Sequence, residues 1–109
     1  MKLKLSTYQR VMCNVIVGGM NGDVRTIRKA MKALDALEFK KDERERIGLQ
    51  QTPDGYVWNP HEEKWEIEIN DEEAALTLKN AVASYSKWPA QFAREVIDLA
   101  EQLGIGDES

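Results

Sequence analysis

The segment Gly55-Tyr-Val-Trp-Asn-Pro-His-Glu-Glu-Lys-Trp-Glu-Ile-Glu-Ile69 decides the predicted fold, because its periodicity differs from that of the rest of the chain. Its last five residues alternate between apolar and acidic side chains, which is the two-residue repeat of a half-buried strand. Tyr56 and Trp58 are two residues apart in the preceding run, and a polar stretch at residues 60–64 separates the two runs. We therefore predict one antiparallel β-hairpin over residues 55–69.

The segments on either side of this hairpin repeat every three to four residues, which predicts amphipathic helices. Ser6 followed by Gln9 has the pattern of a capping box, and Asp23 is a favourable N-cap residue. The helices are expected from Thr7 to Val17, after Asp23, from Asp42 to Ile47, between Asn70 and Trp88, and from Pro89 to Gly104. The second helix has an apolar stripe that should face the core, formed by Val24, Ile27, Met31, Leu34 and Leu37. The predicted fold is α+β, a mainly helical small domain with one antiparallel β-hairpin between two helical halves, and residues 1–109 form a single domain.

The composition limits the function classes that need to be considered. The 109 residues are 42% apolar and 31% charged, as in ordinary soluble globular domains, and the net charge of −4 disfavours a general nucleic-acid binder. The single cysteine cannot form an intramolecular disulfide, and there is no Cys/His set for zinc. No apolar run is long enough to span a membrane, and the start of the chain lacks the apolar core of a signal peptide. We therefore expect a cytoplasmic protein with no cofactor, no metal and no membrane partner.

Few residues of the chain suggest catalytic chemistry. His61 is the only histidine and has no nucleophile or second metal ligand near it in sequence, so we interpret it as a solvated turn residue. Cys13 lies near the apolar face of the first helix, where a small core residue is the expected role. The acidic residues between Glu66 and Glu73 lack the pattern of a metal-binding loop, and those that begin a helix complement its dipole. An enzyme that uses His61 or the carboxylates is therefore the weakest of three hypotheses.

Two groups of residues are candidates for contact with a partner. The hairpin is aromatic on one side, and an isolated hairpin is marginal in water, so Trp58 and Trp65 should anchor that side on the helices or on a partner protein. Leu76 points away from the apolar stripe of its own helix and extends this candidate protein-binding set. On the second helix, a basic stripe could hold an anionic partner; it comprises Arg25, Arg28, Lys29 and Lys32.

Several short segments, taken in order, resemble a known group of proteins. They are Leu5-Ser-Thr-Tyr-Gln-Arg10, Glu45-Arg-Ile-Gly-Leu49, Val57-Trp-Asn59, Trp65-Glu-Ile67 and the closing amphipathic helix. The arrangement resembles small uncharacterised proteins of bacteriophages and prophages, in which helices surround a short hairpin. This resemblance implies a phage-associated, non-enzymatic role, in the virion or in manipulating the host, and therefore a location in the virion or the host cytoplasm. It supplies no catalytic residues.

The leading hypothesis from the sequence is a protein–protein interaction protein without chemistry of its own, whose partners include a second copy of itself. Its support is the absence of a catalytic set and the aromatic hairpin. The alternative is a nucleic-acid-associated regulator that docks the basic stripe of the second helix on phosphates, without sequence-specific recognition.

Overall fold

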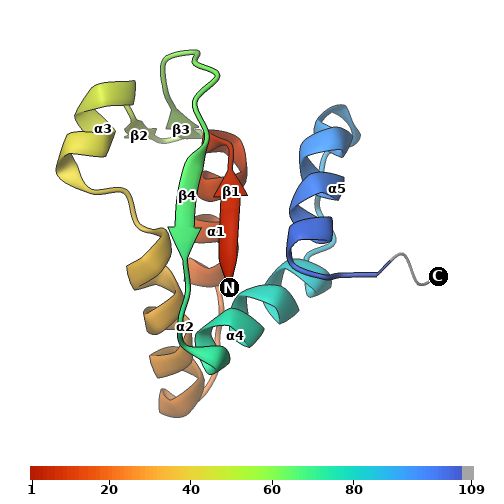
Figure 1. Ribbon diagram of the computed structural model, residues 1–109. Coiled ribbons are helices and arrows are strands. Elements are labelled where there is room, and N and C mark those ends of the chain that lie inside the picture. The colour runs from red at the N-terminus through yellow and green to blue at the C-terminus, as the bar shows by residue number, and fades with distance from the viewer. Residues whose placement is uncertain (107–109) are drawn as a thin grey trace.

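The computed structural model describes residues 1–106, which form five α-helices, one 3₁₀ turn and four short strands. In chain order the elements are β1 (Lys2–Leu5), α1 (Thr7–Gly18), α2 (Val24–Leu37), α3 (Lys41–Ile47), β2 (Gln50–Thr52), β3 (Gly55–Val57), β4 (Trp65–Glu68), α4 (Glu72–Ser84), η1 (Ala90–Phe92) and α5 (Ala93–Gln102). Figure 1 shows α1 behind the two strands β1 and β4, with α2, α4 and α5 around them. The mainly helical α+β class predicted from the sequence is confirmed.

The strands pair differently from the prediction. β4 pairs antiparallel with β1, whereas β3 pairs with β2 in a separate two-stranded sheet. The predicted hairpin over residues 55–69 is therefore wrong, because its two halves belong to different sheets. Alternation identifies a strand but not its partner, and β1 has the complementary pattern: Lys2 lies opposite Glu68, and Lys4 opposite Glu66. These opposite charges on the outer face favour this register over a local hairpin.

The β2–β3 hairpin is closed by the turn from Thr52 to Gly55, whose proline, aspartate and glycine are residues that favour turns. Asn59 connects this hairpin to α3, since its N–H donates to the carbonyl of Ile47 at 2.8 Å. Gly48 ends α3 in the left-handed conformation, with φ of 63°, as its position predicts. A Cβ atom at Gly48 would also lie 2.6 Å from the side-chain amide of Asn59, so a larger residue here would have to displace that amide as well as adopt the left-handed backbone.

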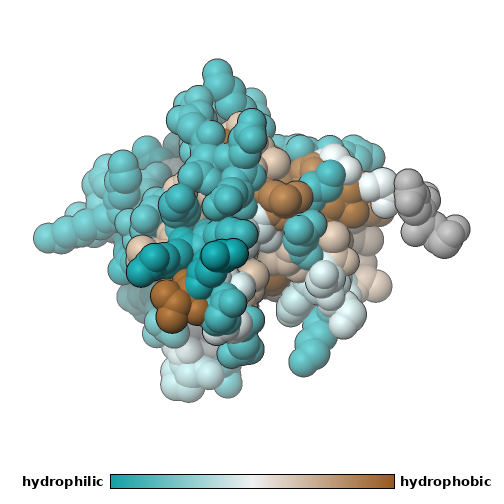
Figure 2. Space-filling view, turned by 90° about the horizontal axis from the view of Figure 1, so that it is seen from below, coloured by the Kyte–Doolittle hydropathy of each residue, from teal (hydrophilic) through white to brown (hydrophobic). Residues whose placement is uncertain are grey.

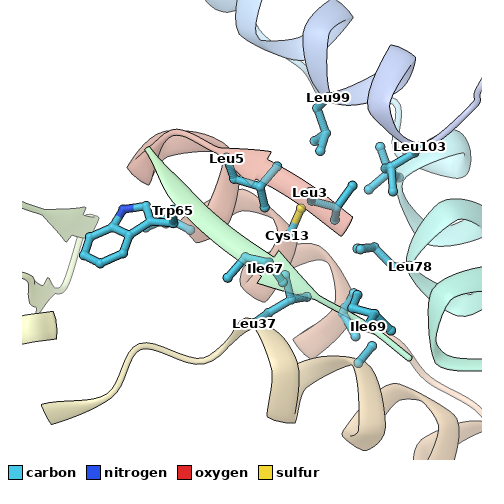
Figure 3. Close-up of a cluster of buried hydrophobic side chains, with 14 of the residues drawn as sticks. Leu3, Leu5, Cys13, Leu37, Trp65, Ile67, Ile69, Leu78, Leu99 and Leu103 are labelled. Atoms are coloured by element: carbon cyan, nitrogen blue, oxygen red, sulfur yellow. The ribbon is translucent and has the colours of Figure 1, made fainter. Parts of the chain in front are cut away.

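The core lies between the inner face of the β1–β4 sheet and the surrounding helices. Figure 3 shows apolar side chains from the sheet, α1, α2, α4 and α5 converging on one cluster. The fully buried members include Leu5, Leu37, Leu78 and Leu99, together with Cys13 of α1. The predicted core role of Cys13 is confirmed, and burial raises the pKa of its thiol to about 12.

The helix starts follow local capping signals. Ser6 and Gln9 form the predicted capping box of α1, and Asp23 caps α2 by accepting from the Thr26 N–H. The N-cap of α4 is Asp71 and not Asn70, because the carboxylate of Asp71 accepts from the Ala74 N–H at 2.9 Å. Pro89 likewise does not begin the last helix: it precedes the 3₁₀ turn η1, and α5 starts at Ala93.

Arg10 is a buried cation that joins three elements. Its guanidinium donates to the carbonyls of Leu37 and Glu38 at the end of α2, at 2.9 and 2.6 Å, and to both carboxylate oxygens of Glu43 on α3. It also lies 4.1 Å from the ring centroid of Phe39. Burial acts to raise the pKa of the Glu43 carboxyl, but hydrogen bonds from Arg10 and from the Lys40 N–H hold that pKa below its usual range. The fold thus satisfies this charge with good geometry, as a buried cation requires.

Side-chain amides attach α5 to the rest of the fold. The Lys4 N–H donates to Oε1 of Gln102 at 2.7 Å, and Nε2 of Gln102 donates to the Lys4 carbonyl at 2.8 Å. The amide of Gln102 therefore occupies the place of a neighbouring strand at the free edge of β1. The buried Gln9 of α1 donates to the Glu95 carbonyl and to Asp98 of α5. These bonds fix α5 against both β1 and α1.

Candidate functional site

Trp65, predicted to anchor its strand on the helices or on a partner protein, lies inside the protein, so the first of these alternatives holds. Its side chain is 5% exposed, its ring packs edge-on against Phe39, and its indole N–H donates to Oγ1 of Thr7 at 2.8 Å. In Figure 3 it lies at the end of the core cluster that is farthest from α4 and α5. The aromatic side predicted for residues 55–69 is divided, because Trp58 is half-buried against the core while Tyr56 is exposed. Trp65 therefore anchors the core and is not available on the surface.

His61 is not the solvated turn residue that the sequence suggests. Its Nε2 lies 2.7 Å from Oγ1 of Thr7, the same oxygen that accepts from Trp65, and its ring is nearly perpendicular to the Trp65 ring. Its Nδ1 is buried without a hydrogen-bond partner within residues 1–106. The segment between β3 and β4 is therefore packed onto α1 through His61, a long-range contact that local sequence does not reveal.

The clearest surface feature is an apolar strip on α2, formed by Val24, Ile27 and Met31, which we call the α2 stripe. Their exposed fractions are 69%, 44% and 56%, respectively. The sequence assigns these residues to the core, and for them that assignment is wrong. Of the predicted inner stripe, Leu37 is buried and Leu34 half-buried. Figure 2 shows a mostly hydrophilic surface interrupted by small hydrophobic areas.

The small residues of α2 explain why its apolar stripe faces outward. Ala30 and Ala33 are buried, and they lie on the side of the helix that packs within the fold. Small side chains allow neighbouring helices to approach closely, so α2 turns its alanines inward and leaves larger residues outside. The sequence does contain a signal for this orientation, because the alanines form a second face of α2 that can pack in the core in place of the more apolar stripe. The α2 stripe is the functional candidate that sequence reasoning missed.

The predicted basic residues lie beside the α2 stripe. Arg25, Arg28, Lys29 and Lys32 line a shallow groove together with Val24 and Glu73 of α4. Lys32 is paired with Asp71 at 3.2 Å. Arg25 and Arg28 are exposed, and neither has an ion-pair partner within the described part of the chain. The basic stripe is thus assembled as predicted, with part of its charge already neutralised by the helix next to it.

Leu76 is exposed on the outer face of α4, at 56%, as its position in the helix predicts. Its neighbours one turn earlier on that face are Glu72 and Glu73. It is the one large apolar side chain of α4 that is exposed. The three candidates Trp58, Trp65 and Leu76 therefore do not form one surface by themselves, since one of them is buried in the core.

Other parts of the described structure offer little for chemistry. A hollow of about 150 Å³ lies between α1, α3 and the β2–β3 hairpin, with Val11, Phe39 and Leu49 among its apolar lining and Arg44 among its polar lining. Within residues 1–106, no three or more His, Cys, Asp or Glu side chains gather as a metal ion would need. No helix in that range is long and apolar enough to cross a bilayer. Comparison with protein-family models, curated proteins and solved structures gives no match for this chain.

Proposed function

We propose that this protein acts by binding another protein through the α2 stripe, without catalytic chemistry of its own. The observation that carries this proposal is the exposure of Val24, Ile27 and Met31 along one side of a single helix. Apolar side chains gathered on one surface usually mark an interaction site, because complete burial of a Val, Ile or Met side chain from full exposure is favourable by about 1.5–3 kcal/mol and these three retain part of that exposure. Apolar residues at steps of three and four are also the pattern by which helices recognise partner grooves and helices.

Aspartate substitutions on the α2 stripe test this proposal. We expect Met31→Asp and Ile27→Asp to abolish association. Met31→Asp should leave the melting temperature nearly unchanged, because Met31 is 56% exposed, and Ile27→Asp should lower it only modestly, because Ile27 is 44% exposed. The readouts are light scattering of the purified protein for self-association and capture of partners from the native cells. Ile97→Asp on α5 is the matched control, since Ile97 is 57% exposed on a different helix. Leu76→Asp tests whether α4 contributes to the contact.

The proposal fails if both α2 variants keep every association of the wild-type protein. It also fails if they unfold the protein at ambient temperature, because the stripe would then be part of the stabilising core. If only Ile97→Asp loses association, the contact surface lies on α5 and not on α2.

A nucleic-acid-associated regulator is the second candidate, and the groove lined by Arg25, Arg28 and Lys29 favours it. In that case binding would depend on phosphates, be independent of sequence and fall steeply with salt. Arg25→Ala and Arg28→Ala would then weaken duplex binding, whereas Met31→Asp would not. Duplex binding that is independent of sequence, falls steeply with salt and is weakened by the two arginine substitutions would favour this candidate over protein binding.

The biological setting that we propose is a phage or prophage accessory role, in the virion or the host cytoplasm. It is supported by the resemblance of the Leu5–Arg10 and Glu45–Leu49 segments to phage-encoded proteins. Capsid or tail genes beside the coding gene would support a virion role, and early regulatory genes would support a host-directed one. A gene neighbourhood without phage genes would contradict the proposal.

A further inference from the structure

The spacing of the α2 stripe fits a helix as the partner. Val24, Ile27, Met31 and the half-buried Leu34 follow one another at steps of three, four and three, which is the heptad spacing of helix-to-helix seams. The exposed part of this seam covers about two turns, or roughly 10 Å of helix. A second helix lying along α2 would cover all three exposed side chains at once. An extended segment or a flat surface would cover them less completely.

The charged residues beside the seam indicate which side chains a partner helix should carry next to its apolar face. Arg28 follows Ile27 directly and lies one turn after Val24, so it borders the seam, and Arg25 lies farther round on the same side. Both are exposed and have no ion-pair partner in residues 1–106. A partner helix would place its flanking side chains next to these guanidinium groups. Carboxylates there would gain charge-assisted hydrogen bonds, whereas lysine or arginine would be repelled.

The same geometry disfavours a second copy of α2 as the occupant. An antiparallel pair that stacked Val24 on Leu34 and Ile27 on Met31 of the other chain would bring the two Arg28 side chains close together. The exposed Asp35, two turns after Arg28 on the same side, ends this basic border, so the border consists of Arg28 with Arg25 behind it. The whole chain carries a net charge of −4, so these two arginines are a local exception on an acidic protein. We infer that the α2 stripe binds an amphipathic helix of a different protein, with Asp or Glu beside its apolar face.

This inference rests on the proposed function and adds the chemistry of the partner. It is tested with two synthetic helical peptides of three heptads, both with leucine at the seam positions. One carries glutamate and the other lysine at the flanking positions. Binding to the full-length protein is measured by fluorescence anisotropy at low and high salt. The contact is small, so we expect the glutamate peptide to bind with a Kd of about 10–100 µM and the lysine peptide to bind at least about tenfold more weakly.

Substitutions show whether the α2 stripe is responsible. Arg28→Glu should reverse the preference between the two peptides, and Met31→Asp should abolish binding of both. Arg94→Glu on α5 changes an exposed arginine far along the chain and should have no effect. High salt should reduce the difference in affinity between the glutamate and lysine peptides, because exposed charges are screened.

Equal binding of the two peptides, or a preference that survives Arg28→Glu, overturns the inference. So does a dimer in light scattering that Met31→Asp dissociates, because the occupant is then a second copy. Cosedimentation with anionic phosphatidylserine vesicles that depends on Met31 also overturns it, since the stripe would then bind a lipid surface. If Met31→Asp still removes natural partners while the peptides show no charge preference, the proposed function stands and only the acidic partner is wrong.

Discussion

Replacing Trp65 with alanine is expected to lower the free energy of unfolding by about 3–5 kcal/mol. The indole is buried, packs edge-on against Phe39 with ring centroids 5.7 Å apart, and donates its N–H to Thr7. His61 also rests on it, so truncation leaves a cavity and removes the support for the segment before β4. The effect should appear as a lower urea midpoint with cooperative unfolding.

Trp65→Phe is the matched variant for this prediction. It keeps most of the packing but loses the hydrogen bond to Thr7, so we expect a smaller loss of about 1–2 kcal/mol. If Trp65→Ala changes the unfolding free energy by less than Trp65→Phe, the indole does not anchor the core as described.

Replacing Arg10 with alanine is expected to cost about 3–5 kcal/mol, although a charged residue is removed from the interior. Arg10 is 3% exposed and holds the end of α2 and the start of α3 together through two carbonyls and Glu43. Without it, the carbonyls of Leu37 and Glu38 lose donors and the Glu43 carboxylate loses its partner. The free energy is measured by urea unfolding at neutral pH.

Arg46→Ala is the control for Arg10. Arg46 also lies over the Trp65 ring, at 4.8 Å, and pairs with Glu63 at 3.0 Å, but both partners of this pair are about half exposed. Surface pairs of this kind contribute less than about 1 kcal/mol. Equal effects of Arg10→Ala and Arg46→Ala would contradict the account of Arg10 as a buried structural cation.

Local signals in the sequence were sufficient to locate the five helices, although not the exact starts of α4 and α5, and they were insufficient for the strand pairing. Ser6, Asp23 and Gly48 act on neighbouring backbone groups, so the ends of their helices follow from nearby residues. The partner of β4 lies about sixty residues away in β1, and only the alternating lysines opposite Glu66 and Glu68 indicate it. The pairing of β1 with β4 depends on the packing of the whole fold, and it forms in place of the predicted local hairpin over residues 55–69.

The pattern of apolar residues also failed to predict which polar side chains are buried and which face of α2 points inward. Arg10 and Gln9 are polar and belong to helix α1, yet both are buried because distant carbonyls and carboxylates satisfy them. On α2, Ala30 and Ala33 compete with Ile27 and Met31 for the interior, and close packing selects the alanines. The basic stripe beside them was correctly located, because charged residues at helical spacing lie on one solvated arc.

The central claim is that the α2 stripe is a contact surface for another protein. It is tested most directly by placing the photo-crosslinking residue p-benzoylphenylalanine at position 31 and irradiating the cells that make the protein. Position 97 on α5, which is equally exposed, serves as the comparison. We predict a discrete crosslinked protein species from position 31 that Ile27→Asp removes, and no such species from position 97. The same crosslinks from both positions, or none from position 31 with the protein folded, would contradict the claim.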